Sequence, residues 1–419
     1  MKKTIVLFLL ILTSSVLFSC RNESTDILAE SANETTIENG DVTVEADNKD
    51  EPKRLTEEEK AAFYKVVEFD LPKDFRDAVV KYMYKCAEIK WQPKEDYSTT
   101  SDNNSWSVNL SYKKGTVYHG VPYSSCTSGA DHFSSLIVDG KYFPRELGYQ
   151  TEPGLNCYTA IQEAYQTFIP TQMTSHHWLP GDSKFCLDIV GDYEYKEGTT
   201  KTEEICTLNG KDKIYDCYSL LQKGDIIYTV KIIGDGNIHC RLVVDEPTIV
   251  KNGLGKIIPS RSYVTCIEST NAFDKTRTDG VKTTWYVNHT YSFDKLFNSN
   301  YVPITLKGYS QPRSEMEAPY LGLDMEITPA LLSKGMFTGV IRSNFPLVFG
   351  RVDILDKSGN VVASKDKCDL YNVKKMGVRN TFTNMFDTLE KGKEYTFVLT
   401  AGIVPGNVEL ARVNFTYGK

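Results

Sequence analysis

The chain has 419 residues, a formal net charge of −7 and 41% hydrophobic residues. This length exceeds one ordinary domain, and the apolar content is that of a globular protein. The acidic balance, without any basic cluster interleaved with aromatic residues, argues against nucleic-acid binding.

The first twenty residues have the pattern of an export signal. Two lysines precede an apolar stretch at 5–12 that is too short to span a bilayer, and small residues follow it. Residues 17–20, Leu-Phe-Ser-Cys, resemble a bacterial lipobox, in which Cys20 would be lipidated and become the mature N-terminus. Ordinary cleavage near Ser19 is the alternative. We therefore expect an exported protein, held to a bacterial cell membrane by N-terminal lipid alone, on the periplasmic or surface side of an outer membrane.

Residues 21–55 are rich in Glu, Asp, Asn, Ser and Thr, with few large apolar side chains. Such a segment cannot bury enough surface to offset its ordering entropy, so we predict a disordered acidic tether. Nine cysteines remain after Cys20. In an exported chain this odd number fits one free thiol and up to four disulfides.

Two helices are predicted after the tether. Thr56 followed by three glutamates is typical of a helix N-terminus, because the acids lie at the positive end of the helix dipole. A second helix is predicted to open at Asp70-Leu71-Pro72 and to end around Trp91-Gln92-Pro93. Its apolar residues have roughly helical spacing: Phe75, Val79, Val80, Met83 and Tyr84.

From about residue 107 to 310 the pattern is mixed. An amphipathic helix is predicted over 157–168, with Ala160, Ile161, Ala164, Tyr165 and Phe168 on one face. Strands are predicted at 225–233, 239–244 and 263–267, with a turn at 221–225 and a loop insertion at 251–262. A helix followed by antiparallel strands indicates an α+β domain, which we place at residues 56–315.

The C-terminal residues, 316–419, are expected to be all-β. Strands at 347–355 and 361–364 flank a turn at 357–360, and further strands are predicted at 395–400 and 408–417. About a hundred residues of short strands favour an immunoglobulin-like sandwich.

Cys157 is the first candidate for chemistry because it begins a predicted helix. There the helix dipole favours the thiolate, and backbone N–H donors lie where an oxyanion would develop. His239 begins a short strand after a polar turn and is the candidate base. Glu268 ends the next strand and would lie beside His239, as an orienting group, if the two strands pair as antiparallel neighbours.

Five segments in this order resemble the NlpC-type cell-wall cysteine peptidases. They are Tyr118-His119-Gly120-Val121-Pro122-Tyr123, Gly154-Leu155-Asn156-Cys157, Leu221 to Asp225, His239 to Val244 and Ile267-Glu268. The resemblance covers roughly residues 79–310 and implies a papain-like fold. It also implies hydrolysis of γ-D-glutamyl-diamino-acid bonds in peptidoglycan stem peptides, with no cofactor.

The same resemblance implies the site residues. Cys157 matches the nucleophile, His239 the base, Glu268 the orienting residue, and Tyr123 a tyrosine that lines the site in relatives. The sequence departs from the family where Asn156 precedes the nucleophile in place of Asp, and where Tyr158, Cys240-Arg241 and Glu268 replace the usual residues.

Two alternatives stay open: a catalytically inactive wall-binding lipoprotein, and an amidase that acts on another amide. Cys126 of Cys126-Thr127-Ser128-Gly129 is a competing nucleophile, but no helical apolar face follows it. We predict no metal site, because neither a His-Glu-x-x-His motif nor a Cys-x-x-Cys pair occurs. The sequence does not specify an oligomeric state.

Overall fold

The computed structural model describes residues 50–103, 106–144, 148–171, 178–179, 186–231, 238–370 and 372–419. The predicted signal peptide with Cys20, nearly all of the predicted tether, and the turn at 234–237 lie outside these ranges. Residues from Lys49 to Lys419 form one compact unit. Among the described helices, none is long and apolar enough to cross a membrane.

Helices of the described ranges are α1 Glu57–Ala61, α2 Phe75–Glu88, α3 Ala130–Ser135, α4 Cys157–Tyr165, α5 Thr202–Tyr218, α6 Phe293–Asn298, α7 Pro329–Ser333 and α8 Val378–Thr381. Two 3-10 turns, Lys307–Ser310 and Arg313–Glu315, also occur. The start predicted for the first helix is confirmed, since Thr56 caps α1 and forms a capping box with Glu59.

Helix α2 ends earlier than the sequence pattern predicts. It begins at Phe75 after the N-cap Asp74 and ends at Glu88, and the expected helix end at Trp91 is wrong. Residues Lys90–Pro93 instead form strand β2, which pairs with β5 (Tyr118–His119) and β8 (Lys141–Tyr142). The Trp91 indole is buried and donates to the Gly120 carbonyl oxygen at 2.9 Å, so tertiary packing sets this boundary.

A six-stranded antiparallel sheet forms the centre of the N-terminal region. Its order is β10 Leu187–Ile189, β16 Val302–Leu306, β11 Ile226–Val230, β12 Ile238–Val243, β13 Tyr263–Ser269 and β15 Trp285–Ser292. The three predicted strands are thus confirmed, and β12 and β13 are antiparallel neighbours as expected. The predicted turn before β11 contains Gly224 at φ +88°, whose N–H donates to the Val243 carbonyl oxygen at 2.8 Å.

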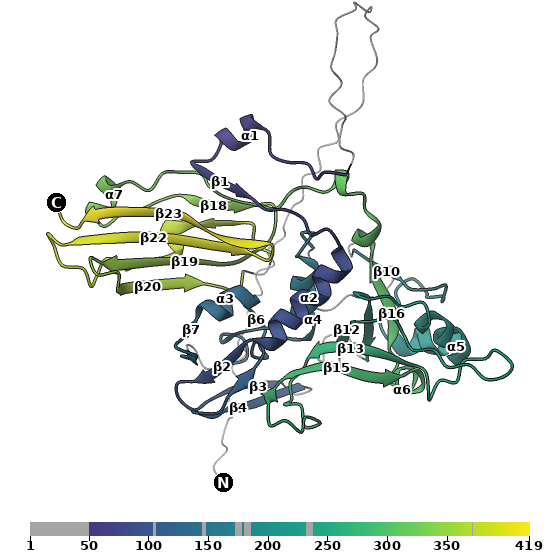
Figure 1. The fold of residues 1–419 in the computed structure, drawn as a ribbon. Coiled ribbons are helices and arrows are strands. Elements are labelled where there is room, and N and C mark those ends of the chain that lie inside the picture. Colours follow the sequence, from purple (N-terminus) through teal and green to yellow (C-terminus); the bar gives the residue numbers. More distant parts are fainter. Residues whose placement is uncertain are drawn as a thin grey trace, which may run out of the picture. The chain divides into compact units, whose positions relative to one another are not determined.

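Helix α4 packs against α2 and against strands β12 and β13 of this sheet (Figure 1). The predicted helix is shorter than expected, since it ends at Tyr165, and its polar face is buried as well as its apolar face. Except for Tyr158, every residue of α4 is buried, including Gln162 and Glu163. A helix that is covered on all sides holds its first residue in a fixed position.

Smaller sheets lie around this centre. A five-stranded sheet has the order β14 Lys282–Thr283, β5, β2, β8 and β7 Ile137–Val138. Two pairs complete the region: β3 Tyr97–Asn103 with β4 Trp106–Tyr112, and β6 Cys126–Thr127 with β9 Pro153–Gly154.

The C-terminal region contains two four-stranded sheets that share one apolar core. One has the order β20 Val361–Lys367, β19 Leu347–Asp356, β22 Glu394–Ile403 and β23 Gly406–Thr416; the other is β1 Lys65–Glu68, β17 Tyr320–Leu323, β18 Val340–Ser343 and β21 Lys375–Gly377. Strand β1 comes from the N-terminal part of the chain and pairs with β17. The short helices α7 and α8 interrupt the expected all-β pattern. The described part of the chain is α+β, as predicted, and most of its strand pairs are antiparallel, with parallel pairs only at β14–β5, β2–β8 and β6–β9.

Candidate active site

Cys157 is the first residue of α4, and the residue before it fixes the helix start. The Asn156 side chain accepts a hydrogen bond from the Thr159 N–H at 3.0 Å, and the Thr159 hydroxyl accepts one from the Asn156 N–H at 2.9 Å. Asn156 Nδ2 also donates to the Tyr149 hydroxyl at 3.0 Å. Asn156 therefore caps the helix that Cys157 begins and fixes the position of that residue.

The three residues predicted to act together do lie together. His239 is on β12 and Glu268 is on the neighbouring strand β13, and His239 Nε2 is hydrogen-bonded to a Glu268 carboxylate oxygen. The His239 ring also interacts with the Cys157 sulfur. Because Nε2 is engaged by Glu268, the ring nitrogen left to face the sulfur is Nδ1.

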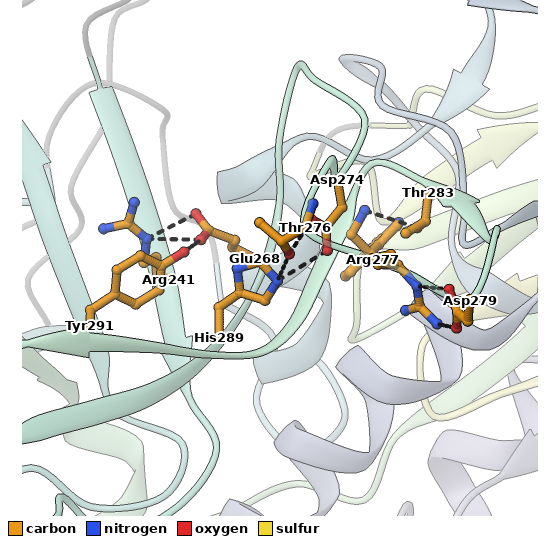
Figure 2. A network of polar contacts seen from close by, with 10 residues as sticks. Arg241, Glu268, Asp274, Thr276, Arg277, Asp279, Thr283, His289 and Tyr291 are labelled. Atoms are coloured by element: carbon orange, nitrogen blue, oxygen red, sulfur yellow. Dashed lines mark hydrogen bonds and ion pairs between the residues drawn. The ribbon is translucent and has the colours of Figure 1, made fainter.

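Glu268 has two further partners that the sequence analysis did not identify. Arg241 Nε lies 2.9 Å from both Glu268 oxygens, and the Tyr291 hydroxyl donates to the same carboxylate (Figure 2). The Arg241 guanidinium lies over the Tyr291 ring, 4.0 Å from its centroid. Arg241 is two residues after His239 on one strand, so the period-two rule for strands could have placed both side chains on one face.

The charges around Glu268 and His239 favour a carboxylate and an imidazolium. Burial is the largest influence on Glu268, but His239, Arg241 and Tyr291 together lower the pKa of that carboxyl to about 2. Burial also opposes the charged form of His239, yet the Glu268 carboxylate and the Cys157 sulfur raise the pKa of His239 to about 9.

A hydrogen bond from the Cys240 thiol is the largest influence on Cys157. Together with His239 it outweighs burial, so the pKa of Cys157 lies well below that of an ordinary thiol. Over the pH range between the pKa values of Cys157 and His239, the two groups therefore exist as thiolate and imidazolium. Cys240 itself stays protonated, because burial raises the pKa of its thiol.

A cavity of about 780 Å³ opens beside these residues. Tyr123, His239 and Glu268 line it, together with the cationic side chains of Lys231 and Lys295. Cys157 is 6% exposed and does not itself line the cavity. A ligand in the cavity would therefore approach the sulfur past Tyr123, His239 and Tyr301, lining residues that interact with Cys157.

Tyr123, the predicted site-lining tyrosine, is buried at 5% exposure. Burial raises the pKa of its phenol, so the hydroxyl keeps its proton and remains a hydrogen-bond donor. Its ring packs against Tyr149 at a centroid distance of 5.7 Å.

The other described histidines belong to different surroundings. His289 on β15 is held by Asp274 at 3.0 Å and by Thr276 at 3.4 Å, beside the Glu268 cluster (Figure 2). His119 lies on β5, and burial lowers its pKa. His132 is fully buried in α3 and lies 2.9 Å from Asp366. Residues 176 and 177, also histidines, lie outside the described ranges.

All nine cysteines of the described ranges are free thiols, so the predicted disulfides are wrong for this structure. Eight of the nine are buried, and six of these belong to the main apolar core, where cysteine packs as a small hydrophobic residue. The competing nucleophile Cys126 has its sulfur 3.7 Å from that of Cys368 and lies on β6, not at a helix start.

No protein-family model matches the sequence, and no curated protein matches it either.

Proposed function

We propose that the chain is an exported, lipid-anchored cysteine peptidase that hydrolyses amide bonds in peptidoglycan stem peptides. One observation carries the proposal: Cys157, at the start of a buried helix, interacts with His239, whose other ring nitrogen is bonded to Glu268. A nucleophile, a base and a group that orients the base are the parts that acyl transfer through a thioester requires.

The mechanism follows from these positions. The Cys157 thiolate attacks the amide carbon, and His239 donates its proton to the leaving amine, which releases the first product and leaves a thioester. His239 then takes a proton from water, and the resulting hydroxide attacks the thioester to release the acid and restore the thiolate. The Cys157 N–H, which the helix does not use, is a donor for a developing oxyanion, and the Tyr123 hydroxyl could donate as well if it left its hydrogen bond with Tyr149.

Charge in the cavity supports a peptide substrate that carries carboxylates. Lys231 and Lys295 line the cavity, whereas Arg241 is engaged by Glu268. Stem peptides with γ-linked D-glutamate carry a free α-carboxylate next to the bond to be cut, and a lysine can pair with it. A cavity of about 780 Å³ has the size of ordinary small-ligand sites, which suits a few residues of peptide.

The proposal extends to the fold and the anchor. We assign the nucleophile helix and the six-stranded sheet to a papain-like arrangement, and the paired C-terminal sheets to an immunoglobulin-like sandwich. Lipid on Cys20 and the tether at 21–55 would let the peptidase reach substrate away from its membrane.

Digestion of defined muropeptides, with the products weighed by mass spectrometry, tests this function. We expect the wild-type protein to cut a stem-peptide amide, and Cys157→Ala and His239→Ala to give no product. Cys206→Ala, which removes a buried thiol in α5, is the matched control and should keep full activity. Cleavage by Cys157→Ala would refute the nucleophile. Absence of any cleavage by the wild-type protein would favour a wall-binding lipoprotein or an amidase with another substrate.

A further inference from the structure

A second cluster of reactive side chains lies away from the Cys157 site, where helix α3 meets the C-terminal strand β20 (Figure 1). His132, Asp366 and Cys368 have ligand atoms that all lie within 4.8 Å of one another. Cys126 adds a second sulfur, 3.7 Å from that of Cys368. Three of the four residues are buried, with exposures of 0% for His132, 3% for Cys126 and 9% for Cys368. Asp366 is partly exposed as a whole residue, but its side chain is only 6% exposed.

We propose that His132, Asp366, Cys368 and Cys126 form a structural zinc site that joins the N-terminal region to the C-terminal sheets. Imidazole nitrogen and thiolate sulfur are the donors that Zn²⁺ prefers, and two sulfurs with one nitrogen and one carboxylate oxygen make a closed four-ligand site. Hard cations such as Ca²⁺ and Mg²⁺ require oxygen ligands, so this donor set does not suit them.

Two distances between ligand atoms can be compared with those of a tetrahedral site. With zinc–sulfur bonds of about 2.3 Å, two thiolates on one ion lie about 3.8 Å apart, and the Cys126 and Cys368 sulfurs are 3.7 Å apart. His132 Nε2 and the Asp366 carboxylate oxygen are 2.9 Å apart, so an ion between them would require a widening of about half an ångström. The Cys126 sulfur is close to that of Cys368 but not within 4.8 Å of all the other ligand atoms, so it would have to move toward the group to become the fourth ligand, and we assign it as the weakest.

The surroundings of His132 fit a metal ligand. The Ser128 hydroxyl lies 2.7 Å from Nδ1, and a ligating histidine commonly donates its second ring N–H to such an oxygen. In the structure Nε2 is hydrogen-bonded to the Asp366 carboxylate, and a metal ion would take the place of the shared proton. The ring is also stacked on Phe349 at a centroid distance of 4.9 Å, which fixes its orientation.

The site would connect segments far apart in the chain. Cys126 and His132 precede the nucleophile, whereas Asp366 and Cys368 lie in and after β20, more than 230 residues later. One backbone hydrogen bond already links the segments, from the Asp369 N–H to the Thr127 carbonyl oxygen at 3.1 Å. A metal ion here would add a cross-link of the kind that zinc supplies to folded domains.

Metal analysis of the purified full-length protein tests the proposal. We expect about one zinc per chain by elemental mass spectrometry, and Co²⁺ substitution should give thiolate-to-cobalt charge-transfer absorption. Chelation should lower the thermal midpoint by about 5 °C or more. Cys368→Ser and Asp366→Asn should lose the cobalt absorption, and Cys126→Ser should weaken it less.

Two controls separate this site from other thiols and from the peptidase. Cys217→Ser changes a buried thiol in α5, and Cys157→Ala changes the nucleophile; both should retain zinc and the cobalt absorption. A wild-type protein that retains no zinc after dialysis against ZnCl₂ would overturn the proposal, whether or not the variants fold. A peptide linked by a Cys126–Cys368 disulfide, found in a non-reduced digest, would overturn it too.

Discussion

Replacing Glu268 by Gln removes one negative charge from the site and keeps the size and hydrogen-bonding ability of the side chain. In the wild-type protein that charge is the largest influence raising the pKa of His239, which reaches about 9 from an ordinary value of 6.5. Once the charge is gone, burial favours the neutral ring, and the Arg241 guanidinium, now without its carboxylate, favours it further. The pKa of His239 must therefore fall.

The size of the effect follows from these values. A fall of about 2 units takes the pKa of His239 to about 7, which corresponds to about 3 kcal/mol of lost preference for the imidazolium. At about pH 8 the imidazolium fraction then drops from about nine-tenths to about one-tenth, and the rate should fall about tenfold. At about pH 6 the ring is charged in both proteins, so the rate should change much less.

The assay is the pH dependence of kcat/KM on a muropeptide substrate, for the wild-type protein and three variants. Glu268→Gln should move the alkaline limb to lower pH. Arg241→Gln should leave it in place or move it to higher pH, because Glu268 then keeps its charge and, among the described residues, has no cationic partner other than His239. The double variant separates activity from folding. A buried arginine without its partner costs about 3 kcal/mol of stability, so the double variant should be more stable than Glu268→Gln while its alkaline limb stays low. An alkaline limb that is identical in Glu268→Gln and the wild-type protein would refute the role of Glu268.

Three further predictions concern other parts of the chain. Cys20→Ser should release the protein from the membrane fraction, and persistent membrane association would rule out lipid on Cys20. Burial raises the pKa of Glu163 to about 8 from 4.5, so the free energy of unfolding should fall as pH rises between these values. Glu163→Gln should remove that fall and raise the free energy of unfolding at pH 7 by about 3 kcal/mol, measured by urea titration. A pH dependence that is the same in this variant and the wild-type protein would show that Glu163 does not cause it. Gly120→Ala should destabilise the protein by about 3 kcal/mol, because Gly120 has φ +83° and a Cβ there would lie 2.2 Å from Trp285. Gly115→Ala, at φ +79° with open space, isolates the backbone strain and should cost only about 1 kcal/mol; equal losses would show that the contact with Trp285 does not matter.

The sequence predicts the candidate site because its members lie at the ends of regular elements. Helix starts and strand ends can be recognised locally, from Asn156 before a helical run and from a polar turn before His239. Once the predicted strands at 239–244 and 263–267 are taken as antiparallel neighbours, Glu268 is expected to lie near His239. The structure brings Cys157, His239, Glu268 and Tyr123 to one place, as this reasoning predicts.

Features that lack a local sequence signal, or that depend on pairing with distant residues, could not be predicted from the sequence. Helix α5 has Gly210 at φ +73° inside it and no strong apolar face, so its sequence lacks helical periodicity. Strand β1 is recognised only through its pairing with β17, some 250 residues away. The His132, Asp366 and Cys368 cluster has no local motif, which explains why the sequence predicts no metal site.

Reactivity of the Cys157 thiol is the most direct test of the central claim that Cys157 and His239 form a thiolate–imidazolium pair. The measurement is the rate at which iodoacetamide alkylates Cys157 as a function of pH, followed by peptide mass spectrometry so that each cysteine is scored separately. We predict a rate that is already high at neutral pH and has its midpoint well below 9, and a loss of that low midpoint in His239→Ala. A Cys157 rate that rises only near pH 9, like that of an ordinary thiol, and is the same in His239→Ala would contradict the account.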